Sequence, residues 1–375
     1  MSERRLMISI VNLLLVVAAV FFAVLVWQLR SLIVILMIAV VVASTLAPIV
    51  ASVQRLRIPR WLAVILVFLG LISILTGAGL LIGPTVVAQI ERLARTLPGY
   101  LDVLGTLAQD LAVRFGVNEP EAFDLINQLF DIQSLTAWAF RSSQQLLVRS
   151  VGVTRGLLGG VFNLILALLL SGYMLAGSSK LIDGLVSLFP KPWDDRLAAQ
   201  VAPVSQRMGG YIQGRLLVSS ILAMAVSFGL IVLGIPEFAL GLGVIAGFTN
   251  LIPFFGPFLG AIPALIVAVA QGGLTFLWVL LLFVIIQNLE TYVLDPLLVG
   301  SSVRVAPLYQ LLAVLGGVQV LGIIGALIVP PWVAGAAVVL ENLYLKPKLR
   351  AEQTIASPSS TLTAAEPEAS PVSTQ

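Results

Sequence analysis

Two carboxylates follow a long uncharged apolar stretch, where such groups have few partners. Residues 274–289 carry no charge, and Glu290 and Asp295 come directly after them, with Gln287 and Asn288 just before Glu290. An ionisable group inside a membrane span is costly unless it faces a partner or water, so its presence there points to function. A carboxylate in that position can exchange a proton or hold a cation. We therefore expect these four polar residues to line the path of a solute or ion.

The same two acidic residues have a second interpretation, in which they lie at the level of the lipid headgroups and are solvated by water. Gly300 and Ser301 follow closely, as at the end of a span. Arg304 would be a counter-ion in the first interpretation and a solvated surface cation in the second. The sequence leaves both interpretations open.

Prolines and glycines interrupt a second apolar stretch. Residues 250–263 contain Asn250, Pro253, Gly256, Pro257, Gly260 and Pro263 among bulky apolar side chains. Irregular backbone at membrane depth is tolerated only where protein or a wet cavity satisfies its peptide groups, and broken helices bind solutes in this way in transporters. The alternative is a kinked helix that packs closely through Gly256 and Gly260. We favour the first alternative and expect Asn250, Pro253, Gly256, Pro257 and Gly260 to line the path of the solute or ion.

The residue inventory excludes several kinds of chemistry. The chain has no cysteine and no histidine, which removes thiol nucleophiles, Ser–His–Asp triads and the usual zinc ligand sets. No nucleophile–base pair is visible, so we expect no enzyme, no cofactor and no metal site. Any proton coupling would have to use carboxylates. A net charge of +3 is too small to indicate a nucleic-acid partner.

The elements that position these residues must be helices in lipid. Of the 375 residues, 59% are hydrophobic and 10% are charged, against about 45–50% and 25% in a soluble domain. The mean hydropathy of +1.06 agrees. A soluble fold of this length cannot bury so much apolar surface, so the lipid bilayer is the expected partner. We predict an all-α polytopic membrane protein.

Hydropathy divides the chain into four parts. Residues 1–88 contain three spans (8–27, 32–51 and 61–83), with a tight turn at 28–31 between the first two. Residues 89–150 form a water-facing helical insert, in which Pro98 and Gly99 kink or break an amphipathic helix. Residues 151–348 hold the remaining spans, including 157–176, 216–233 and 274–299. A polar loop at 178–215 follows the first of these spans and contains Lys180, Lys191, Arg196, Arg207 and Arg215. The tail 349–375 is rich in Ser, Thr, Pro, Ala and Glu, so we expect it to be disordered.

Two stretches in the third part, 237–271 and 306–340, hold 35 residues each, which is too long for one upright span. Each either crosses once as a tilted, broken helix, giving eight spans, or returns as a re-entrant hairpin, giving six. We favour eight. Basic residues prefer the cytoplasmic side, and they place both termini there in either scheme.

These motifs give the chain a resemblance to a known family. The pattern comprises Tyr211 and Gly214, then Ala239, Leu240, Leu242, Gly243, Val244, Ala246, Gly247, Asn250, Ile252, Pro253, Phe254 and Gly256, and later Gln287, Glu290, Pro296, Gly300, Pro307, Gly316, Gly317, Gly322, Gly325 and Pro330. With these residues, 5–348 resembles the autoinducer-2 exporter family of bacterial permease-like proteins. In the first half the resemblance is one of hydropathy pattern alone.

The resemblance implies a multispanning transporter of the bacterial inner membrane that forms a homo-oligomer. Proposed cargoes of this family range from autoinducer-2 to sodium or other cations exchanged for protons. The family often has His before the proline that matches Pro307, and this chain has Ala306 there, which counts against proton coupling at that position.

Three hypotheses follow for the function of the chain. The leading hypothesis is a secondary exporter of a small polar solute such as a signalling molecule. The second is a cation/proton antiporter that uses Glu290 or Asp295. The third, of another class, is a non-transporting scaffold that recruits partners through residues 89–150.

Overall fold

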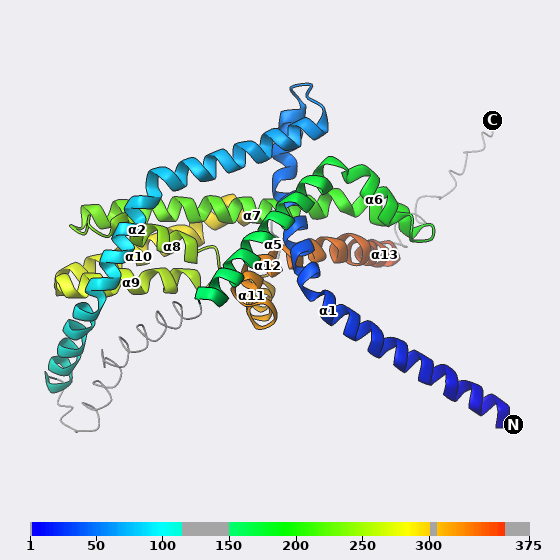
Figure 1. Ribbon diagram of the computed structural model, residues 1–375, viewed down its shortest axis with the longest axis horizontal. Coiled ribbons are helices and arrows are strands. Elements are labelled where there is room, and N and C mark those ends of the chain that lie inside the picture. The colour runs from blue at the N-terminus through cyan, green and yellow to red at the C-terminus, as the bar shows by residue number, and fades with distance from the viewer. Residues whose placement is uncertain (1, 115–149, 301–305, 357–375) are drawn as a thin grey trace, which may run out of the picture.

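The computed structural model describes residues 2–114, 150–300 and 306–356, and in these ranges it contains helices and no strand. The predicted all-α class is therefore confirmed. Five helices are long and apolar enough to cross a membrane, or six if one bent pair counts as a single span. Figure 1 shows α7 (Trp193–Val232) running through the middle of the molecule, where it contacts α1, α8, α10 and α12.

The first helix corrects one sequence prediction. Helix α1 (Ser2–Gln54) continues through residues 28–31, where we expected a turn between two spans. Gln28, Leu29 and Arg30 are good helix formers, and residues 28–31 include neither glycine nor proline to end the helix. The Arg30 guanidinium also lies over the Trp27 ring, 4.7 Å from its centroid. Two apolar runs in sequence thus form one long helix.

Helix α2 (Arg60–Arg114) joins the predicted third span to the amphipathic segment, and it continues through Pro98 and Gly99, so the expected break is absent. The amphipathic part packs on the protein. Leu93 is buried in the main core, the Tyr100 ring meets Phe238 edge to face, and the Gln89 side chain accepts a hydrogen bond of 2.7 Å from the Gly241 N–H. The predicted insert continues to residue 150, and its residues 115–149 lie outside the described ranges, as does most of the predicted tail.

The stretch 237–271 forms a helical hairpin. Helix α8 (Ala239–Thr249) and helix α9 (Gly256–Gln271) lie side by side, because a Cβ on Gly256 would meet Thr249 and Asn250, and one on Gly260 would meet Ala246. The order of these contacts makes the two helices antiparallel. Closeness of the backbones is the reason that only glycine fits at both positions.

The stretch 306–340 forms a second hairpin, from α11 (Pro307–Leu321) and α12 (Ile323–Leu340). Gly322 alone joins them, with a φ of 65° that suits glycine, and Gly317 faces Gly325 across the pair. The two long apolar stretches are therefore hairpins, and the single tilted helix that we favoured for each is not what forms. Helices α8, α9 and α11 are each shorter than a full span, whereas α12 with the helices that follow it, Ile323–Gln353, is long enough to cross, so the described helices do not add up to eight spans.

The remaining helices complete a bundle around α7. Helix α5 (Ser150–Ala176) packs with α1 and α2, and α6 (Ser178–Val186) follows it after a bend of 84°. Helix α10 (Gly273–Leu289) passes into a π-helix, η1 (Glu290–Gly300), which packs on α7. A shorter π-helix, η2 (Glu341–Leu345), and α13 (Lys346–Ala356) follow α12.

Candidate functional site

Three buried polar side chains from three different elements meet beside α7. The Arg215 Nη1 atom donates to Glu290 Oε1 at 2.9 Å, and Arg215 Nη2 donates to Asn250 Oδ1 at 3.3 Å. The Asn250 amide in turn donates from Nδ2 to Glu290 Oε1 at 3.0 Å. The three residues are 5%, 2% and 0% exposed, in the order Arg215, Glu290 and Asn250. Each therefore satisfies part of the hydrogen-bonding capacity of the other two, as buried polar groups require.

Asp295 adds a second carboxylate to this cluster. Its Oδ1 atom lies 3.5 Å from Arg215 Nη1, which makes an ion pair, and its side chain is 42% exposed. Glu290 and Asp295 are five residues apart in η1, and a π-helix closes its hydrogen bonds over that same five-residue step. Both carboxylates therefore reach one guanidinium. In an α-helix, residues five apart are about 140° apart around the axis, so the two carboxylates would point in different directions.

The local sequence explains how each element presents its side chain. Gly214 lets α7 pack closely on η1, since a Cβ there would lie only 2.5 Å from the Leu298 carbonyl oxygen. This close packing brings the neighbouring Arg215 within reach of η1. Asn250 stands at the end of α8, in the break that Pro253 maintains before α9 begins at Gly256. Pro296 lies inside η1 and has no N–H to donate, which suits a departure from the α-helical ladder.

The cluster carries more negative than positive charge. One guanidinium faces two carboxylates, so the ionised cluster has a net charge of −1. Three of its buried atoms make no hydrogen bond within the described ranges: Arg215 Nε, Glu290 Oε2 and Asp295 Oδ1. Buried polar atoms of this kind are rare in native proteins and call for a water, an ion or a ligand as partner.

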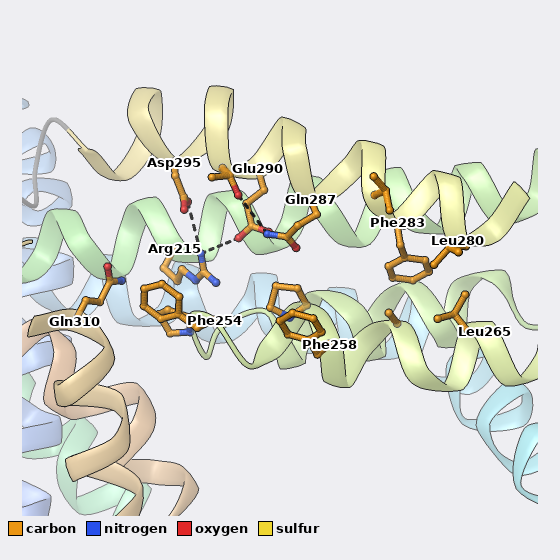
Figure 2. A pocket seen from close by; sticks show the side chains of 15 residues that line it. Arg215, Phe254, Phe258, Leu265, Leu280, Phe283, Gln287, Glu290, Asp295 and Gln310 are labelled. Atoms are coloured by element: carbon orange, nitrogen blue, oxygen red, sulfur yellow. Dashed lines mark hydrogen bonds and ion pairs between the residues drawn. The ribbon is translucent and has the colours of Figure 1, made fainter. Parts of the chain in front are cut away.

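The cluster forms one wall of a cavity of about 440 Å³. The other walls are mainly apolar, and Figure 2 shows Phe254 beside Arg215, with Phe258 and Phe283 further along the cavity. The lining consists of Arg215, Pro253, Phe254, Pro257, Phe258, Ala261, Leu265, Leu280, Phe283, Val284, Gln287, Glu290, Thr291, Asp295 and Gln310. This volume lies within the range of about 300–1,000 Å³ that is typical of small-molecule sites.

A second polar contact connects the other hairpin to this cavity. Gln310, which lines the cavity from α11, donates from Nε2 to the Tyr211 hydroxyl at 3.3 Å. Tyr211 lies one turn before Arg215 on α7 and is buried. Both hairpins therefore border the same site.

The structure brings most of the predicted path residues to this site. Glu290, Asp295, Gln287, Pro253 and Pro257 line the cavity, and Asn250 bonds to its charged wall. The first interpretation of the two carboxylates is thus the one with the geometric support.

Three predicted residues lie elsewhere. Gly256 and Gly260 pack against α8 and hold the hairpin together, as the alternative interpretation expected. The Asn288 side chain is exposed, and its amide bonds to the Val284 carbonyl on its own helix. The two glycines thus have a structural role in the hairpin, since both face α8. Arg304 lies outside the described residues.

Sequence reasoning missed Arg215, which we had assigned to a polar loop with other basic residues. The loop's second half is in fact the start of α7, and Arg215 lies within this helix beside the apolar run 216–233. The available signal was its place directly after Tyr211 and Gly214 of the family pattern. Within the described ranges, no three His, Cys, Asp or Glu side chains gather in a group that could hold a metal ion.

Several known proteins are similar to this chain in sequence. YueF of Bacillus subtilis strain 168, named as a candidate transport protein, is 28% identical over 304 residues, covering 81% of this chain and 82% of the relative. YrrI of the same organism, also so named, is 40% identical over 144 residues, covering 38% of this chain and 40% of the relative. A sodium-lithium/proton antiporter of Halobacillus andaensis is 24% identical over 342 residues, covering 88% and 93%.

A family model also matches over most of the chain. The model described as AI-2E family transporter matches residues 15–345, nearly the whole chain, including both hairpins and every residue of the charged cluster. The chain is a multi-pass helical membrane protein, and it belongs to the AI-2E transporter family.

Proposed function

We propose that the cavity beside Arg215 binds a small polar organic solute, which the protein exports by secondary transport. The observation that carries this proposal is a buried ionic cluster that opens onto a cavity of about 440 Å³ at a helix break. A cavity with one polar wall and several aromatic side chains suits a compact molecule with a few hydroxyl or carbonyl groups. Autoinducer-2 has that character, and it is one member of the class.

The features of the site that favour an organic solute are its size and its donors. The cavity is far larger than one bare ion needs, and Gln287, Gln310 and Thr291 add neutral donors and acceptors around the carboxylates. Arg215 Nε adds a buried donor that has no acceptor within the described part of the chain. Hydrogen bonds to such groups would fix the orientation of a solute.

A second candidate function is exchange of sodium or another cation for protons. Two observations favour it: the cluster has one carboxylate more than it has cations, and Glu290 Oε2 and Asp295 Oδ1 have no hydrogen-bond donor within the described ranges. A relative named as a sodium-lithium/proton antiporter supports this candidate as well. In that case Glu290 or Asp295 would alternate between a proton and the cation.

Transport by purified protein in proteoliposomes tests both candidates. Small polar metabolites and cations would each be offered with and without imposed proton and sodium gradients. The first candidate predicts flux of an organic solute that falls in Glu290→Gln and in Asp295→Asn. Cation flux that is unchanged in both variants would refute the second candidate, and absence of any flux would favour the scaffold instead.

We further propose that the chain lies in the bacterial inner membrane as a homo-oligomer with both termini in the cytoplasm. Two loops are rich in basic residues: the turn that holds Arg55, Arg57 and Arg60, and residues 178–215. Since basic loops prefer the cytoplasmic side, both support a place in the cytoplasm. A continuous α1 that crossed the bilayer once would place the amino terminus on the side opposite Arg55, so the side of the amino terminus is tested directly. Labelling of a cysteine placed at Ser2 in intact cells and in inverted vesicles would provide it.

A further inference from the structure

An apolar groove lies between α2 and α5, and none of its lining residues belongs to the charged cluster. It has a volume of about 620 Å³. Its lining consists of Trp61, Val64, Ile65, Phe68, Leu69 and Ile72 from α2, and Ile165, Leu168, Leu169, Gly172, Tyr173 and Ala176 from α5. Among these lining residues, Tyr173 and Trp61 have a polar group in the side chain, and the others are apolar. The groove therefore suits a ligand with a long apolar part.

The two walls of the groove are antiparallel, so it has a defined start and end. Helix α2 begins at Arg60 and α5 ends at Ala176, and Arg60 contacts residues at the end of α5. The lining on α2 extends from Trp61 to Ile72, which is about 16 Å of helix. Gly172 widens the groove, because a side chain at this position would extend toward the Phe68 ring on the opposite wall. This is the shape of a slot for a single extended chain.

Basic residues gather at the start of the groove. Arg60 donates from Nε to the Leu175 carbonyl at 2.7 Å and from Nη2 to Ser178 Oγ at 2.6 Å. Arg57 precedes it in the turn between α1 and α2, and Lys180 follows Ser178 on α6; both side chains are exposed. Neither these three residues nor Arg55 forms an ion pair with any acidic residue in the described ranges. The positive charge at this end is thus free for an anion.

Aromatic side chains mark the level at which this end of the groove meets the bilayer surface. Trp61 lines the groove directly after Arg60, and Tyr173 lines it near the end of α5; both side chains are exposed. Trp and Tyr are enriched at the headgroup level of membranes. After this point α6 turns away from α5 by 84°, as a helix does where it leaves the apolar layer. The basic end therefore lies at headgroup height and the apolar groove below it.

We infer that this groove binds one acyl chain of an anionic phospholipid, with the phosphate held by Arg57 and Lys180. Basic pockets beside membrane helices on the cytoplasmic side recognise anionic headgroups in this way. Arg60 joins the start of α2 to the end of α5 and the start of α6 through its hydrogen bonds to Leu175 and Ser178, and it adds positive charge. The lipid joins α2 to α5, outside the transport cavity, and its binding does not depend on which cargo is carried.

Lipid retention by the detergent-purified, full-length protein tests this inference. Wild-type protein mixed with equal amounts of phosphatidylglycerol and phosphatidylcholine is expected to retain the anionic lipid preferentially in native mass spectra. Arg57→Gln with Lys180→Gln should lower that preference by roughly fivefold per charge removed. The control is Lys191→Gln, an exposed lysine beyond α6 that does not line the groove. Equal retention of the two lipids by wild-type protein would overturn the inference.

A groove-filling variant tests the apolar part separately. Gly172→Leu places a side chain in the slot beside Phe68 and should reduce bound lipid, whereas Gly77→Leu, on α2 beyond the groove and with open space around it, should not. A second copy of the chain is the competing occupant. Because the chain has no cysteine, Ile65→Cys gives a clean probe, and disulfide-linked dimers of that variant in membranes would refute the lipid assignment.

Discussion

The Arg215 guanidinium and the Glu290 carboxylate form a buried ion pair, with Nη1 2.9 Å from Oε1, although 75 residues separate them in the chain. Their side chains are 6% and 3% exposed. A buried pair of this kind adds little net stability, yet the loss of one partner leaves a charge without compensation. The pair therefore couples the integrity of the site to the packing of α7 against η1.

Replacing Arg215 by methionine should destabilise the protein by about 3–5 kcal/mol, because Glu290 would remain buried without its cation. Thermal unfolding in detergent, followed by size-exclusion chromatography, measures the effect. The double variant Arg215→Met/Glu290→Met should regain most of the lost stability without regaining transport. Arg196→Met, an exposed change on the same helix, serves as the control. Unfolding of Arg215→Met at the wild-type temperature would contradict the buried pair.

Replacing Asp295 by asparagine should separate function from stability. The side chain is 42% exposed and its contact with Arg215 is long, at 3.5 Å, so the stability change should stay below about 1 kcal/mol. Transport rates in proteoliposomes should nevertheless fall, since the variant removes the spare negative charge of the cavity. Asn288→Ala, on the same long helix but facing away from the site, should transport at the wild-type rate. A wild-type rate in Asp295→Asn would exclude this carboxylate from the path.

Adding a methyl group at Gly260 should disturb the first hairpin. Its Cβ would lie 2.7 Å from the Ala246 Cα, so Gly260→Ala should lower the free energy of unfolding by roughly 1–3 kcal/mol. Gly316→Ala is the matched control, because it lies in a helix with no neighbour within 4 Å. That control should stabilise the protein by about 0.5–1 kcal/mol, through the higher helix propensity of alanine. Equal effects of the two changes would contradict the close packing of α8 and α9.

Cysteine labelling tests whether the amphipathic part of α2 packs on the protein. Leu93 is buried in the main core and Arg95 is exposed. A water-soluble maleimide should therefore react slowly with Leu93→Cys and quickly with Arg95→Cys, and the native chain offers no competing thiol. Similar rates at both positions would mean that this segment is separate from the hairpin, as a free insert would be.

The continuity of α1 has a direct distance test. Spin labels on Leu14→Cys and Leu36→Cys should be about 33 Å apart if residues 28–31 are helical, by the rise of an α-helix. A turn at those residues would bring the two labels to roughly half that separation. Both side chains are exposed, so labelling should leave the fold unchanged.

Composition and hydropathy determined that this chain is a helical membrane protein. They also pointed to Asn250, Gln287, Glu290 and Asp295, because polar groups beside apolar runs stand out without any knowledge of the fold. The breaks at Pro253 and Gly322 were readable too, since proline and glycine interrupt helices by their own covalent structure.

Only the tertiary structure decided which charges meet. Arg215 looked like one of several loop cations until α7 extended across it, and Glu290 and Asp295 share it because η1 winds as a π-helix. The choice between a hairpin and a single broken span is likewise decided by contacts between two helices, such as Gly260 with Ala246. Local patterns record the cost of placing a group in lipid, whereas its partner depends on how whole helices pack.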